Sequence, residues 1–153
     1  MLATALLVAL ATSAILVSNA AGDAHTRAHT ARTLNVTDTA HLHFLKESSS
    51  QLIDEGAATG TLPGTVRVSF DLGVTVSGTF TIYAHDGTII GHGSGVLHKS
   101  SSQSDVYVSF GGTMTVSHGT GRYAHAHGTG GFYGVIDRRN YSATIQTTGS
   151  LAY

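Results

Sequence analysis

The stretch TVRVSFDL, residues 65–72, decides the fold class of this chain. Its polar and apolar residues alternate strictly, and the apolar ones are Val66, Val68, Phe70 and Leu72. A period of two predicts a β-strand with one face toward a core and the other toward water. The alternation continues over residues 74–82, and Asp86-Gly87 then provides a strong two-residue hairpin signal. Antiparallel strands are therefore expected.

Further strand candidates with short connections extend from residue 33 to the end, and no segment there has a helical pattern. They cover residues 41–45, 51–60, 88–98, 106–116, 132–136 and 141–153. A set of seven or eight strands must bury one face and protect its edges, and closure into a barrel does both. We predict an all-β fold, an eight-stranded antiparallel β-barrel over 33–153, with a β-sandwich as the alternative. Glycines within the long strands favour the strongly coiled barrel.

The first residues predict export. Residues 2–17 form an apolar run, and Ser18-Asn19-Ala20 then matches the small-residue pattern before a signal peptidase site. The run is slightly short for a membrane span, which needs about 20 apolar residues. We predict a signal-peptide helix over 1–20 and a flexible polar tail over 21–32. The mature protein would be secreted and free of the membrane, whereas a retained anchor is the alternative.

Composition excludes several classes of function. The absence of cysteine excludes disulfides, thiolate metal sites and cysteine nucleophiles. Charged residues make up 11% of the chain and the formal net charge is -1, so no basic surplus exists to neutralise phosphates. Nucleic acid is therefore not an expected partner. The number of histidines, 10, is unusual. Imidazole side chains as a class become positive in mildly acidic surroundings.

Three glycine-containing segments carry a resemblance to a known family. They are GTGRYAHAHG (119–128), GFYGVID (131–137) and TGSLAY (148–153). The first resembles the glycine-rich signature of allene oxide cyclases and dirigent proteins, and the others are similar to small secreted bacterial proteins of that barrel type. The resemblance covers roughly residues 56–153. It implies an eight-stranded barrel, a pocket for a hydrophobic ligand and, as in plant members, a homo-oligomer, and no catalytic residue of the family is carried over to this sequence.

Aromatic residues are the candidates for the lining of such a pocket. We expect a pocket that admits a small hydrophobic molecule and is lined by Tyr83, Tyr107, Phe110, Tyr123 and Phe132. Tyr123 stands between glycines and also fits a plug at one end of the barrel. A lumen filled by side chains is the alternative, and a barrel of this size favours it.

A metal site is the weaker interpretation of the motif His41-x-His43-x-x-x-Glu47. On a strand the two histidines share a face about 7 Å apart, and Glu47 would be the third ligand. The motif matches the core of the first cupin motif, but Asn35 and Asp54 stand where flanking glycines belong. A solvated strand face is favoured, with no metal and no cofactor. The pair His125-x-His127 is likewise interpreted as an exposed polar loop.

These observations favour a secreted barrel without an identifiable catalytic set. It would bind a small hydrophobic molecule or serve a structural role outside the cell. An isomerase (cyclase) that acts on a hydrophobic substrate in the barrel is the alternative, and a histidine-coordinated metal protein is the second. Ligand identity and subunit number stay open at this level.

Overall fold

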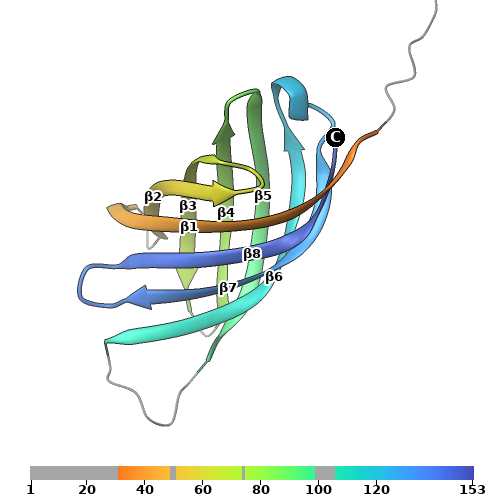
Figure 1. The fold of residues 1–153 in the computed structure, drawn as a ribbon. Coiled ribbons are helices and arrows are strands. Elements are labelled where there is room, and N and C mark those ends of the chain that lie inside the picture. The colour runs from red at the N-terminus through yellow and green to blue at the C-terminus, as the bar shows by residue number, and fades with distance from the viewer. Residues whose placement is uncertain (1–30, 49–50, 74, 99–105) are drawn as a thin grey trace, which may run out of the picture.

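The computed structural model describes residues 31–48, 51–73, 75–98 and 106–153. Eight antiparallel strands form one closed barrel (Figure 1). They are β1 (Thr33–Ser48), β2 (Gln51–Gly60), β3 (Gly64–Leu72), β4 (Thr75–Ala84), β5 (Gly87–His98), β6 (Tyr107–Gly119), β7 (His127–Asp137) and β8 (Ser142–Ala152). The predicted all-β barrel is confirmed, and the sandwich is excluded by closure. The predicted signal peptide (1–20) and most of the predicted tail (21–32) lie outside the described residues.

Each strand pairs with its successor, and β8 pairs back with β1 from Thr33↔Ala152 to Leu42↔Ala143. Backbone hydrogen bonds between Arg32 and Tyr153 extend this seam, the pairing of β1 with β8, by one residue. Within the described residues no helix has the length and apolar character needed to span a membrane.

The alternation in the sequence correctly separates inward from outward positions on β3 and β4. Val66 pairs with Ile82 and Val68 with Phe80, and these residues belong to the main apolar cluster. Between them stand Arg67 and Thr81, paired with each other on the outside of the barrel. The period of two therefore defines the lumen as well as the strands.

Two β-bulges change this alternation. On β1 the pairing shifts between Phe44 and Lys46, so that Leu45 is the extra residue. On β6, His118 pairs with Ile90 and Val116 pairs with the next residue of β5, so that Ser117 is the extra residue. An extra residue moves every following side chain to the other face of its strand.

Inward glycines make room for the largest side chains of the core. A Cβ atom on Gly134 would lie 2.3 Å from Cζ of Phe110, and one on Gly91 would lie 2.4 Å from Cζ of Phe80. Phe110 is fully buried and also contacts Phe70 and Phe132 at ring distances of 6.2 and 5.9 Å. The narrow lumen accepts these rings because their cross-strand partners on the neighbouring strands, Gly134 and Gly91, have no side chain.

A short 3-10 helix, η1 (Gly121–Tyr123), closes one end of the barrel. Tyr123 is buried there in a second apolar cluster and meets the ring of Tyr153 at 5.1 Å. Arg122 lies over the ring of Tyr153 and pairs with Asp86 in the turn between β4 and β5. The predicted plug at a barrel end is thus the position that Tyr123 occupies.

Candidate functional site

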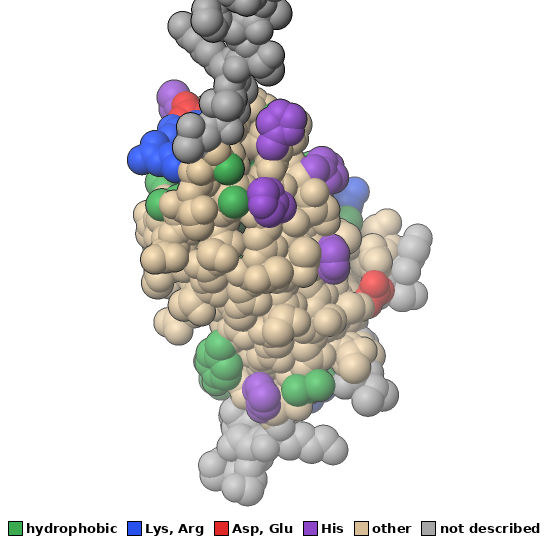
Figure 2. All heavy atoms as spheres, turned by 90° about the vertical axis from the view of Figure 1, so that its right-hand side faces the viewer, with side chains coloured by type: hydrophobic (Ala, Val, Ile, Leu, Met, Phe, Trp, Pro, Cys, Tyr) green, Lys and Arg blue, Asp and Glu red, His purple; other side chains and the backbone are tan. Residues whose placement is uncertain are grey.

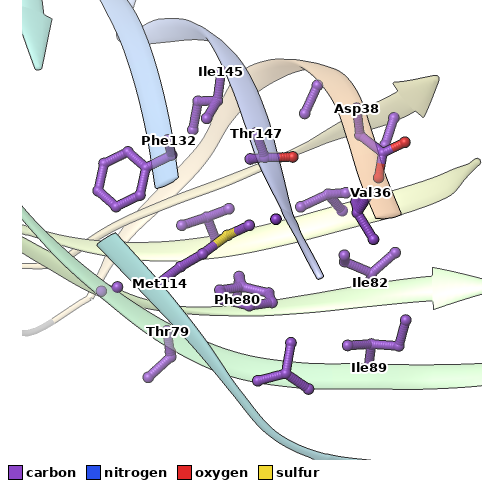
Figure 3. Close-up of a pocket in the computed structure, with 18 of the residues that line it drawn as sticks. Val36, Asp38, Thr79, Phe80, Ile82, Ile89, Met114, Phe132, Ile145 and Thr147 are labelled. Carbon is purple, nitrogen blue, oxygen red and sulfur yellow. The ribbon is translucent and has the colours of Figure 1, made fainter. Parts of the chain in front are cut away.

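The barrel lumen contains a cavity of about 120 Å³ between its two apolar clusters (Figure 3). Its wall is almost entirely apolar and includes Val36, Val76, Phe80, Ile82, Met114 and Phe132. The favoured expectation of a completely filled lumen is therefore corrected. The physical reason is that Gly78, Gly93 and Gly149 form part of the wall and contribute no side chain.

The polar residues of the wall include Asp38 and Thr147 (Figure 3). They are cross-strand partners on β1 and β8. Asp38 is buried, and its Oδ1 accepts a 2.9 Å hydrogen bond from the backbone N–H of Leu62. The carboxylate thereby ties the turn between β2 and β3 to β1, because a buried N–H group requires a partner.

Replacing Asp38 by alanine is expected to lower the free energy of unfolding by about 1–3 kcal/mol, because it leaves the N–H of Leu62 without its acceptor. Urea unfolding followed by circular dichroism measures this loss. Thr147→Val is the matched control, since no hydrogen bond of its hydroxyl to a described residue is found; it leaves no buried partner unsatisfied and should cost less than about 1 kcal/mol. Equal losses in both variants would show that the bond to Leu62 is not what stabilises the turn.

The structure divides the five aromatic residues predicted to line a pocket. Phe110 and Phe132 do form part of the cavity wall. Tyr123 is buried in the end plug and is not part of the wall. Tyr83 and Tyr107 are corrected, because they project outward from β4 and β6 with 44% and 43% of their surface exposed.

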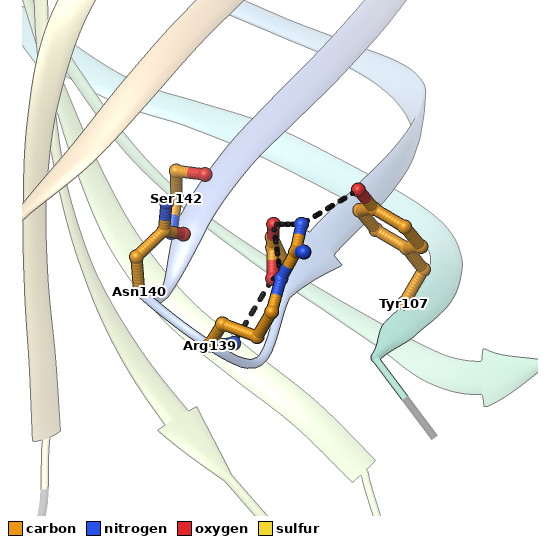
Figure 4. Close-up of polar contacts among 5 residues, drawn as sticks. Tyr107, Arg139, Asn140 and Ser142 are labelled. Atoms are coloured by element: carbon orange, nitrogen blue, oxygen red, sulfur yellow. Dashed lines mark hydrogen bonds and ion pairs between the residues drawn. The ribbon is translucent and has the colours of Figure 1, made fainter. Parts of the chain in front are cut away.

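Tyr107 has a different environment, near the turn between β7 and β8 (Figure 4). Its hydroxyl accepts a 2.9 Å hydrogen bond from Nη2 of Arg139, whose guanidinium also lies over the tyrosine ring. Arg139 pairs with Asp137, and this hydrogen bond holds the pKa of the Asp137 carboxyl below its usual value. Tyr107 thus belongs to an exposed ion-pair cluster on the outside of the barrel.

The three residues of the metal hypothesis do not converge. His41 and His43 are exposed, at outward positions of β1 opposite Ala57 and Glu55. Glu47 follows the bulge at Leu45. Because of the bulge, Glu47 pairs with Leu52, an inward residue of β2, and does not continue the series of His41 and His43. Among the described residues no group of three histidine or carboxylate side chains has the arrangement of a metal site.

Asp54 is a functional candidate that the sequence did not indicate. It is only 1% exposed on β2, and its Oδ1 has no hydrogen-bond partner. Burial raises the pKa of this carboxyl to about 6, although the nearby His43 acts in the opposite direction. Asp54 alternates with its neighbours along β2 in the same way as the inward residues Leu52 and Ala58. A charged residue at an inward position of the strand was therefore the signal in the sequence.

No protein-family model matches this chain, and neither a curated protein nor a solved structure matches it.

Proposed function

We propose that this protein is a secreted binding protein whose barrel holds one small hydrophobic molecule. The observation that carries the proposal is the apolar cavity of about 120 Å³ in the centre of the lumen. A dry, apolar cavity of about 150 Å³ in another protein binds benzene. The expected occupant is therefore an apolar molecule of roughly one ring.

The chemistry of the wall favours binding over catalysis. An acid–base mechanism needs several polar groups that converge on the reacting atoms. The wall offers one carboxylate and a few hydroxyls, and the carboxylate of Asp38 already accepts a structural hydrogen bond from Leu62. The apolar run over residues 2–17 supports the proposed export. The relation to allene oxide cyclases and dirigent proteins stays a prediction, because one barrel architecture serves many functions.

The lumen offers a paired test, because Ala58 faces the cavity and its neighbour Ala57 faces solvent. Toluene is the probe, and the melting temperature of the wild-type protein should rise by several degrees at saturation, since a bound ligand stabilises the folded state. Ala58→Leu places about three extra carbon atoms into the cavity and should abolish this rise. Ala57→Leu adds the same atoms outside and should leave it unchanged.

Differential scanning calorimetry measures the shift, and a two-dimensional NMR spectrum verifies the fold of each variant. The proposal fails if toluene stabilises neither wild type nor Ala57→Leu, or if Ala58→Leu responds as strongly as wild type. Chemical conversion of a hydrophobic molecule by the purified protein would instead favour the isomerase alternative.

A further inference from the structure

Among the described residues, the charged side chains that are buried inside the barrel are all acidic. Every lysine, arginine and histidine in this part of the chain is exposed. Figure 2 shows blue cationic and purple histidine side chains on the surface of one face. The two buried charged residues, Asp38 and Asp54, are both carboxylates. The described part of the interior therefore has no basic side chain to neutralise them.

Asp38 is the buried carboxylate that belongs to the wall of the lumen cavity, whereas Asp54 is not part of that wall. Asp38 is 8% exposed, and its Oδ1 accepts the hydrogen bond from the N–H of Leu62. No hydrogen bond from a described residue to its other oxygen, Oδ2, is found. Because a carboxylate accepts several hydrogen bonds on its two oxygens, Asp38 retains the capacity to accept one from a ligand.

Thr147 is the second polar side chain at an inward position of the wall. It is the cross-strand partner of Asp38, and such partners have Cβ atoms about 5 Å apart on the same face. Figure 3 shows the two side chains on the same side of the cavity. The other hydroxyl-bearing residues of the wall alternate with inward residues and face outward, and they are Ser77, Thr79, Thr129 and Ser150. The inward polar side chains are therefore gathered in one place.

A carboxylate in apolar surroundings is best satisfied by a cation. A buried charge is costly unless it is paired, and the low dielectric of an apolar wall strengthens attraction between opposite charges. The wall near Asp38 includes Val36 and Ile82 and supplies no lysine, arginine or histidine from the described residues. An ammonium group has three N–H donors and no acceptor, so it can satisfy both Asp38 and the hydroxyl oxygen of Thr147. A neutral alcohol has one donor and no charge.

We propose that the cavity selects a small amine, a molecule of about one ring that carries a single ammonium group bound by Asp38 and Thr147. This inference rests on the proposed function, because it names the class of molecule that the same cavity holds. The ring contacts the apolar part of the wall, which includes Phe80 and Met114. The ammonium group supplies the positive charge for the carboxylate of Asp38.

The test compares benzylamine, benzyl alcohol and toluene as probes. Benzylamine and benzyl alcohol have the same number of heavy atoms, and near pH ~7.5 only benzylamine is cationic, because alkyl amines titrate well above neutrality. Titrations followed by two-dimensional NMR give a Kd for each probe. The wild-type protein should bind benzylamine with a Kd at least about tenfold lower than that of benzyl alcohol.

The variant Asp38→Asn removes the charge and keeps an amide oxygen that can accept the hydrogen bond from Leu62. It should lose the preference for benzylamine, whereas its Kd for toluene should stay within about twofold of the wild-type value. Thr147→Val keeps the carboxylate and should reduce the preference by about threefold, because one acceptor is lost. Asp54→Asn is the matched control, since it removes a buried carboxylate that is not part of the wall, and it should retain the preference.

The outcomes separate this inference from the proposed function. If toluene binds to the wild-type protein but benzylamine binds no more tightly than benzyl alcohol, the amine selectivity is overturned and the hydrophobic cavity remains. An unchanged preference in Asp38→Asn, or equal losses in Asp38→Asn and Asp54→Asn, would also overturn the selectivity, because a direct contact with Asp38 would not explain it. If none of the three probes binds, both proposals fail.

Discussion

Replacing Asp54 by asparagine is expected to make the protein more stable at neutral pH by up to about 3 kcal/mol, and to change little near pH ~4. The carboxyl is buried without a partner for Oδ1, and its pKa in the folded protein is raised from 3.8 to about 6. The folded state therefore binds more protons than the unfolded state between these pH values. Stability associated with this group is complete below its unfolded pKa and is lost as the pH rises through about 6.

Urea unfolding at a series of pH values between ~4 and ~7.5 measures this effect as the difference between wild type and Asp54→Asn. Asp71→Asn is the control, because Asp71 is exposed on the neighbouring strand and accepts a hydrogen bond from Gln51. That variant should give a difference that does not grow with pH over the upper half of the range. A parallel pH profile for Asp54→Asn and wild type would contradict the assignment.

The second large effect concerns the contact between Phe110 and Gly134. Phe110→Ala should lower the free energy of unfolding by about 3–5 kcal/mol, because the ring is fully buried among Phe70 and Phe132. Gly134→Ala should cost about 1–3 kcal/mol, since its new Cβ would lie 2.3 Å from Cζ of Phe110. In the Phe110→Ala background the same glycine change should cost far less.

This double-mutant cycle isolates the steric conflict between the two positions. Gly131→Ala on the same strand is the control, because the nearest atom to its added Cβ is the carbonyl oxygen of Gly112 at an ordinary 3.7 Å. It should be neutral or slightly stabilising, as the added methyl restricts the unfolded chain. Additive costs for Phe110→Ala and Gly134→Ala would show that the ring and the glycine are not complementary.

Alternation alone predicts most of the barrel wall. It assigns Val68 and Phe80 to the lumen, and it also assigns Tyr83 to the outside beside Thr81. The expectation that Tyr83 lines a pocket is based on its aromatic side chain and not on alternation. The predicted inward position of Tyr83 is therefore wrong. The inward carboxylates of Asp38 and Asp54 follow the rule as well, since both stand in inward series.

Bulges and cavities are what alternation does not predict. The extra residue Leu45 separates Glu47 from His41 and His43, and nothing in the local sequence marks that bulge. The cavity depends on how side chains from several strands pack across the lumen. Gly78, Gly93 and Gly149 form part of its wall and contribute no side chain. Such meetings depend on register between strands that are distant in sequence.

The seam between β1 and β8 has a consequence for the order of events during synthesis. Because β1 has β8 as one of its two neighbours, the ring of hydrogen bonds is incomplete until β8 has left the ribosome. Pairings of such long sequence separation form slowly. The nascent polypeptide therefore lacks this neighbour of β1 until β8 emerges.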